Sequence, residues 1–200
     1  PEQILRAGTD LGRDPEEMVA VQPVAPDGVL SEDQPGFVLR HVGQRDRDDG
    51  ELGVWSRFPL RELGDLGLPP ARVMRVGVDA PGMPFVLYVV HALNPLRDTS
   101  FADQRRFTDE LLTAIDGEER PVVVAGDFNT IWGEHEIRLF RAACGLATAD
   151  PGNRPSFPSW RPKRHLDFIL HSPGIVIDRF DMPAIGLSDH LPLICDFHIP

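Results

Sequence analysis

The stretch VVVAGDFN at residues 122–129 joins an unbroken apolar run to two polar side chains. Three consecutive valines are typical of a strand that is buried on both faces, as in a sheet covered by other layers. Side chains two residues apart on extended backbone point to the same side, so Asp127 and Asn129 are expected to face one pocket. The stretch therefore predicts a buried strand that carries polar chemistry at its carboxyl end.

Apolar patterns on both sides of this strand predict a layered fold. Phe107, Leu111 and Ile115 recur every four residues, which predicts a helix over about 99–115 that ends before Gly117. Many strands, few helices and no strict alternation of the two favour an α/β sandwich over a parallel doubly wound sheet. The other expected elements are helices at 1–11 and 134–144 and strands at 18–21, 37–42, 52–56, 73–78, 85–90, 165–170, 175–179 and 191–199.

The composition is that of an acidic globular chain. Its 200 residues suffice for a sizeable core, and we expect one domain over 1–200. The 20 Lys and Arg against 31 Asp and Glu give a net charge of −11. This charge opposes a large non-specific duplex-binding surface but is compatible with a small cationic or metal-filled cleft. Lys163 is the only lysine, a skew that suggests a bacterial source with a GC-rich genome.

The sequence gives no indication of a membrane or secreted protein. Its longest apolar runs, such as 85–90, are far shorter than the roughly 20 residues that cross a bilayer. No basic segment is followed by an apolar one, so we see no secretory signal and expect a cytoplasmic location. Cys144 and Cys195 lack the spacing of a zinc site or a disulfide framework, and both are expected to be buried.

Titratable residues also occur at the ends of other apolar segments. His91 follows the run 86–90, Asp167 lies inside HLDFIL at 165–170, and His190 precedes the last strand. A buried aspartate needs a partner, and one that accepts the Nδ1 proton of a histidine fixes the tautomer of that ring. Asp167 and His190 are therefore predicted to pair, with Asp127 positioning a water or a nucleophile.

The order of these segments resembles the endonuclease/exonuclease/phosphatase superfamily, which includes DNase I-like nucleases, abasic-site endonucleases, sphingomyelinases and inositol-polyphosphate phosphatases. The motifs that carry the resemblance are the strand ending in His91, GDFN at 126–129, HLDFIL at 165–170, SDHLPL at 188–193 and LGVWSRFPL at 52–60. The resemblance covers most of the chain from about Leu52. It implies a four-layered α/β sandwich, with two mixed β-sheets packed face to face and helices outside, and metal-assisted cleavage of phosphoesters.

The resemblance also implies roles for individual residues. His190 matches the catalytic histidine, Asp167 the aspartate that orients it, and Asp127 the aspartate that positions the nucleophile. Asn129 matches the asparagine that faces the phosphate, and His91 the histidine beside the leaving group. Asp189 matches the acid of the Ser-Asp-His motif, which is usually placed at the metal. We further predict that Asn94, Trp160 and Arg57 bind substrate, although packing under the loop 151–162 is the favoured role for the Trp160 ring.

The amino-terminal part departs from the family pattern. Members begin with a strand and a helix, followed by a second strand ending in Gln-Glu, whose glutamate is the principal magnesium ligand. Here residues 1–11 resemble that helix and residues 18–22 that second strand, so the first strand is expected to be missing and the fold to be shortened at its amino terminus. Pro23 follows Gln22, so the glutamate is also expected to be missing. Asp27 or Glu32 could substitute as the ligand of Mg²⁺ or Mn²⁺.

Three functions remain open from the sequence. The first is a phosphodiester or phosphomonoester hydrolase, using a His-Asp pair and a divalent metal, whose substrate is a small phosphoester, a phospholipid head group or nucleic acid. The second, motivated by Pro23, is a metal-independent enzyme on the same fold, with acid-base chemistry on a non-phosphate small molecule, as in secondary metabolism. The third is a non-catalytic binding module, which the joint presence of the five polar residues Asp127, Asn129, Asp167, Asp189 and His190 disfavours.

Overall fold

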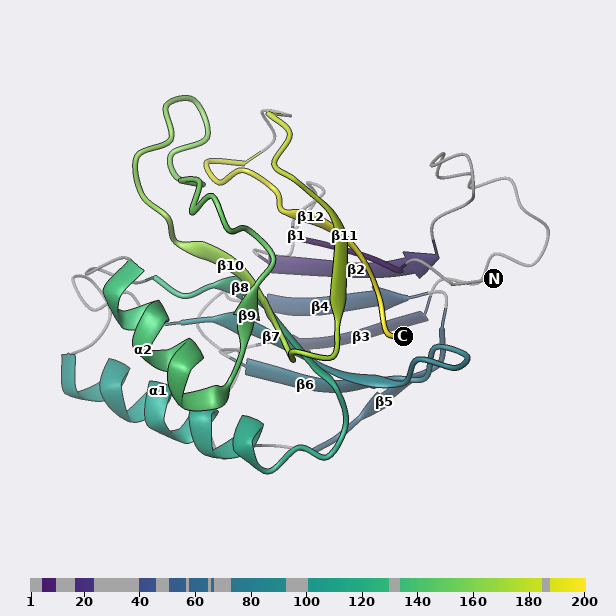
Figure 1. The fold of residues 1–200 in the computed structure, drawn as a ribbon. Coiled ribbons are helices and arrows are strands. Elements are labelled where there is room, and N and C mark those ends of the chain that lie inside the picture. The colour runs from purple at the N-terminus through teal and green to yellow at the C-terminus, as the bar shows by residue number, and fades with distance from the viewer. Residues whose placement is uncertain are drawn as a thin grey trace.

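The computed structural model describes residues 5–9, 17–23, 40–45, 51–56, 58–64, 66, 73–92, 101–129, 134–184 and 188–200. Two six-stranded sheets lie face to face, and two helices cover the outer side of one of them (Figure 1). Each sheet contains parallel and antiparallel pairs. The predicted α/β sandwich with two mixed sheets is therefore confirmed.

Along the chain, the first four described strands belong to sheet A, the next six to sheet B, and the last two return to sheet A. Sheet A has the order β11 (Val176–Asp181), β12 (Ile194–His198), β1 (Leu5–Thr9), β2 (Glu17–Pro23), β4 (Glu51–Ser56) and β3 (Arg40–Arg45). Sheet B has the order β5 (Leu60–Glu62), β6 (Val73–Val78), β7 (Phe85–His91), β8 (Val122–Asp127), β10 (Asp167–His171) and β9 (Ala147–Thr148). Strands β3 and β4 form an antiparallel pair, and so do β6 and β7.

Period-two alternation in β7 divides the apolar side chains between two cores. Phe85, Leu87 and Val89 belong to the core between the sheets, together with residues of β4 and β12. The intervening side chains, Val86, Tyr88 and Val90, pack under α1 (Phe101–Asp116) and α2 (Glu134–Cys144). Burial on both faces explains why the central strands of sheet B are almost wholly apolar.

Three of the four expected layers are present among the described residues. Both described helices lie against sheet B, and none of them covers sheet A. Neither is long and apolar enough to cross a membrane. Both cysteines are free; Cys195 is buried as expected, whereas Cys144 is only partly buried.

The helix expected at 1–11 is wrong, because Leu5–Thr9 form strand β1 between β12 and β2. An apolar pattern this short fits a helix or a strand. Backbone hydrogen bonds to β12 on one side and β2 on the other stabilise the strand. A strand thus does precede β2 in this fold. Leu5 pairs with both Phe197 and Pro23, and Gly8 with Ile194. Pro23, the expected position of the metal glutamate, therefore lies level with Phe197 rather than with the start of β12.

Candidate active site

Three neighbouring strands of sheet B bring their polar ends to one edge. His91 at the end of β7 is opposite Asp127 at the end of β8, and Asp127 is opposite Asp167 at the start of β10. Asp127 and Asp167 alternate in phase with Ala125 and Ile169, which belong to the core between the sheets. The two carboxylates therefore close this end of the inter-sheet core, with only 6% and 3% of their residue surfaces exposed.

The structure brings Asp167 and His190 together as predicted. His190 Nδ1 donates a hydrogen bond to Asp167 Oδ2 at 2.8 Å, and the imidazole is the more exposed partner. Because an ionised carboxylate only accepts hydrogen bonds, this contact places a proton on Nδ1. Nε2 is the ring nitrogen that Asp167 does not contact. Asp167 thus sets the orientation of the His190 ring.

Surrounding carboxylates favour the charged form of His190. Burial by itself opposes the imidazolium, but the hydrogen bond from Asp167 and the negative charges of Asp167, Asp127 and Asp189 outweigh it and raise the pKa of His190 to about 9. His190 is consequently a cation at neutral pH, held among three acids.

The surroundings of Asp127 disfavour its charged form, whereas those of His190 favour the charged form of the imidazole. Burial and the nearby charge of Asp167 raise the pKa of Asp127 to about 7, although His190 and the Asn129 backbone N–H favour its ionised form. A carboxyl group with this pKa is able both to accept and to release a proton near neutral pH.

The turn after β8 fixes Asn129 beside Asp127. Asn129 adopts a positive φ of 44°, which asparagine tolerates better than most residues, and its N–H donates to Asp127 Oδ1 at 2.7 Å. Its Nδ2 donates to the Ala92 carbonyl oxygen at 2.8 Å. One amide hydrogen is therefore used to hold the side chain, and the second has no partner among the residues that the structure describes.

Ser156 supports the site, although no sequence pattern selected it. Its hydroxyl is completely buried and accepts hydrogen bonds from the N–H groups of Leu166 and Asp167, each at 3.3 Å. Its carbonyl oxygen accepts from the Leu191 N–H at 2.9 Å. One residue thus links the strand that carries Asp167 to the segment that carries His190. A serine in a proline-rich loop gives no sequence signal for such long-range contacts.

The loop before β10 also approaches the imidazole. The ring centroid of Phe157 lies 4.8 Å from that of His190, so Phe157 forms one wall of the site. Trp160 is 76% exposed, and the favoured prediction that its ring packs under the loop is wrong. Asp189 is exposed next to His190, and its backbone carbonyl oxygen accepts from the Ser159 N–H at 2.7 Å. The predicted positions Arg57, Asn94, Asp27 and Glu32 lie outside the described residues.

Asp127, Asp167 and His190 form a group that could ligate a metal ion, since one ligand atom from each lies within 4.8 Å of the others. Carboxylate oxygens suit hard divalent cations, and a bound cation would reduce the repulsion between two adjacent buried carboxylates. The hydrogen bond between His190 and Asp167 occupies one of these oxygens. The remaining carboxylate oxygens of Asp127 and Asp167 therefore fit a hard divalent cation beside the His-Asp pair, and Asp189 stays a predicted ligand.

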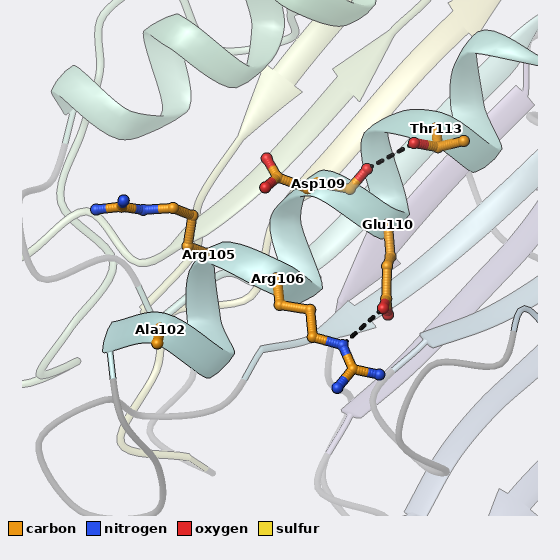
Figure 2. A pocket seen from close by; sticks show the side chains of 6 residues that line it. All are labelled: Ala102, Arg105, Arg106, Asp109, Glu110 and Thr113. Carbon is orange, nitrogen blue, oxygen red and sulfur yellow. Dashed lines mark hydrogen bonds and ion pairs between the residues drawn. The ribbon is translucent and has the colours of Figure 1, made fainter.

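A separate hollow of about 370 Å³ lies on the surface of α1 (Figure 2). All of its lining residues come from this one helix: Ala102, Arg105, Arg106, Asp109, Glu110 and Thr113. Figure 2 shows that Arg106 is tied to Glu110 and Thr113 to the Asp109 backbone, so its polar groups largely bind one another. The hollow contains none of the strand-end residues described above.

Comparison with known proteins agrees with this geometry. Residues 9–190 match the model of the Endonuclease/Exonuclease/phosphatase family. The chain belongs to this family. Asp127, Asp167 and His190 all fall within the matched range, which ends at His190. The resemblance that the sequence motifs suggested is therefore confirmed.

The similar curated proteins carry names that assign no substrate. A UPF0294 protein of Vibrio vulnificus is 27% identical over 166 residues, covering 78% of this chain and 56% of the relative. The chain thus spans about half the length of the curated relatives that it matches.

Solved structures agree on the fold. The endonuclease domain of TRAS1, a telomere-specific non-LTR retrotransposon, has a TM-score of 0.61 at 15% identity and covers 82% and 81% of the two chains. The mannosyl-6-phosphatase Bt3783 of Bacteroides thetaiotaomicron has a TM-score of 0.55 at 16% identity, covering 82% and 77%. At these identities the similarity concerns the fold alone.

Proposed function

We propose that this chain is a phosphoester hydrolase whose active site is built on Asp127, Asp167 and His190. The observation that carries the proposal is the buried pair of carboxylates with one imidazole at the shared edge of β8 and β10. Family membership gives the reaction class, because the family comprises nucleases and phosphatases. The finer assignment of roles follows from the chemistry of the three groups.

Asp127 is the proposed base. A water molecule attacks phosphorus and transfers a proton to the Asp127 carboxylate, whose pKa of about 7 suits both uptake and later release of that proton. The new bond joins water oxygen to phosphorus, and the bond from phosphorus to the leaving oxygen breaks. That oxygen departs with the bonding electrons and takes a proton from His91, which lies opposite Asp127 in the next strand.

His190 and Asn129 are the proposed stabilisers of charge on the phosphoryl group. The imidazolium of His190 presents its Nε2–H to a non-bridging oxygen, while Asp167 holds the ring through Nδ1. The free amide hydrogen of Asn129 donates to a second oxygen, since its partner hydrogen is bound to Ala92. These donors are fixed before substrate arrives, so little reorganisation is needed during the reaction.

A divalent cation completes this proposal. Asp189 would hold Mg²⁺ or Mn²⁺ through its carboxylate, a ligand that both metals prefer, so that Asp127 stays available as the base. When bound, such a cation neutralises phosphoryl charge and acts as a Lewis acid. Its positive charge also offsets the repulsion between Asp127 and Asp167.

Small phosphoesters, phospholipid head groups and nucleic acid are all compatible with this chemistry. The similar folds of an endonuclease domain and a sugar phosphatase illustrate that the scaffold itself does not choose among them. The loops around the strand ends determine that choice.

The direct test is hydrolysis of bis-p-nitrophenyl phosphate and p-nitrophenyl phosphate, with Mg²⁺, Mn²⁺ or EDTA. We expect metal-stimulated release of p-nitrophenol, and we expect Asp189→Ala to reduce both this stimulation and the calorimetric heat of metal binding. Undiminished hydrolysis in EDTA would refute the metal's role and support the metal-independent alternative. The absence of hydrolysis under every condition would refute the proposed function.

A further inference from the structure

The hairpin at 157–164, here called the basic arm, stands above the strand ends beside the candidate site (Figure 1, the yellow-green loop between β9 and β10). Phe157 and Arg164 close it through reciprocal backbone hydrogen bonds of 3.0 and 2.9 Å. Ser159 fastens it to the His190 segment, because its N–H donates to the Asp189 carbonyl oxygen and its hydroxyl to the Ser188 carbonyl oxygen at 2.6 Å. The arm is an ordered projection anchored at the site.

The basic arm carries positive charge that nothing in the described chain neutralises. Arg161, Lys163 and Arg164 are exposed, and none forms an ion pair with another described residue. By contrast, most other described cations outside the helices bind carboxylates, as Arg154 does with Asp150. Residues 151–166 contain no Asp or Glu, although the whole chain has a net charge of −11. Because salt screens charges beyond roughly 8 Å, an approaching phosphate responds to this local charge.

Trp160 lies within the same hairpin with its ring in solvent. At 76% exposure it exceeds the other exposed large hydrophobic residues of the described chain, Leu139 and Val176. The flat face of an exposed indole suits the stacking of an unpaired base. The combination of an open aromatic ring with flanking cations is how proteins bind single-stranded nucleic acid.

We propose that the basic arm binds single-stranded nucleic acid and places it across the His190 site. Trp160 stacks on a base, while Arg161, Lys163 and Arg164 contact successive phosphates. This proposal deepens the proposed function and relies on it for the cleavage step, but not for binding.

Charge and area favour a single strand over the other polyanions. A duplex or an anionic membrane presents a broad surface, and a protein of net charge −11 is repelled by it outside the arm. Membrane binding also needs an extended apolar face, whereas the arm exposes one large hydrophobic side chain. A single strand needs only a narrow cationic track and a stacking ring.

The test is fluorescence anisotropy of a labelled oligothymidylate of about twelve nucleotides, a length within the usual site sizes, measured in EDTA so that binding is separated from turnover. We expect Trp160→Ala to weaken binding at least about fivefold. A plot of the logarithm of the association constant against the logarithm of salt concentration has a negative slope. In the triple variant Arg161→Ala, Lys163→Ala, Arg164→Ala this slope should be shallower by about 2.

Matched controls remove the same groups elsewhere. Leu139→Ala removes an exposed apolar side chain from α2, and the triple variant Arg105→Ala, Arg106→Ala, Arg138→Ala removes three exposed cations from the helices. Both should bind the oligonucleotide as the native chain does. Equal weakening by the two triple variants would overturn the proposal, because it would show that only net charge matters.

The remaining outcomes also discriminate. Equally tight binding of a duplex of the same length would overturn the preference for single strands. Trp160-dependent binding to vesicles of phosphatidylserine and phosphatidylcholine, without oligonucleotide binding, would overturn nucleic acid as the partner. Arm-dependent binding by a chain that hydrolyses no phosphoester would refute the proposed function alone. Hydrolysis of bis-p-nitrophenyl phosphate by a chain whose arm variants bind normally would refute the arm alone.

Discussion

Two buried polar clusters on opposite faces of sheet B accommodate charge in different ways. On the helical side, Glu118 Oε1 accepts hydrogen bonds of 2.6 Å from both Arg75 Nε and the Tyr88 hydroxyl. Burial opposes ionisation of Glu118, but the bonds from Arg75 and Tyr88 outweigh it and hold the pKa of Glu118 below its ordinary value. The negative charge in this cluster is fully matched.

The cluster between the sheets is not matched in this way. Asp127 and Asp167 face one imidazole. Burial and the charge of Asp167 raise the pKa of Asp127, and the surrounding carboxylates raise the pKa of His190 against the effect of burial. Both clusters combine carboxylates with a cationic partner, yet only the incompletely neutralised one has a group, Asp127, that titrates near neutral pH. We therefore expect Glu118 to serve stability, and we propose that Asp127 trades stability for reactivity.

The largest expected effect is that of Asp127→Asn. An amide cannot accept the proton of the attacking water, so kcat should fall by about 100-fold to 10,000-fold. Loss of the repulsion from Asp167 should at the same time raise the free energy of unfolding by about 1–2 kcal/mol. Phosphodiester hydrolysis and urea denaturation measure the two effects. A variant that is both active and less stable would contradict this side of the comparison.

Glu118→Gln should give the converse result. It leaves the Arg75 guanidinium without its buried counter-charge, and we expect a loss of about 2–3 kcal/mol in urea denaturation with unchanged kcat. The control is Glu110→Gln, which breaks an exposed pair with Arg106 and should change stability by less than about 0.5 kcal/mol. A large loss of activity in Glu118→Gln would show that the two clusters are not separate in function.

The pH dependence of stability in EDTA tests the surplus charge itself. His190 has its pKa raised from 6.5 to about 9 in the folded chain, so its stabilisation is complete below pH 6.5 and is lost as the pH rises through 9. The raised pKa of Asp127 acts in the same direction, because ionisation between about pH 4 and 7 destabilises the fold. We expect unfolding free energy to fall by about 2 kcal/mol between pH 6 and 9.5. A flat profile, or a rise, would contradict this balance of charge.

The smallest expected effect concerns Ser156→Ala. Two buried N–H groups lose their acceptor, which should cost about 1–2 kcal/mol and lower kcat several-fold by loosening Asp167 against His190. Ser172→Ala is the matched control, because its hydroxyl accepts from the Val122 N–H at the other end of β8. That variant should lose comparable stability and keep its kcat. Equal kcat values in the two variants would make Ser156 a structural residue only.

Local patterns made much of this molecule predictable. The valine run at 122–124 and the apolar run at 85–90 specify buried strands wherever they occur, and both form the centre of sheet B. The pairing of Asp167 with His190 followed from the cost of burying a lone carboxylate. These predictions succeeded because each depends on a short segment and one physical requirement.

Features that depend on distant partners were missed. Strand β1 is fixed by pairing with β12 at the other end of the chain, which the short segment 5–9 does not reveal. Ser156 acquires its role only when the loop returns to Leu166 and Leu191. The exposure of Trp160 was also missed, because composition alone favours packing of an indole.

The central claim is that the cluster with unmatched charge is the hydrolytic site and the matched cluster is structural. The most direct measurement compares His190→Ala with Glu118→Gln in the hydrolysis of bis-p-nitrophenyl phosphate with Mg²⁺, each corrected for the folded fraction. We predict that Glu118→Gln retains the native rate and that His190→Ala loses at least about 100-fold. Equal rates in the two variants would contradict the claim.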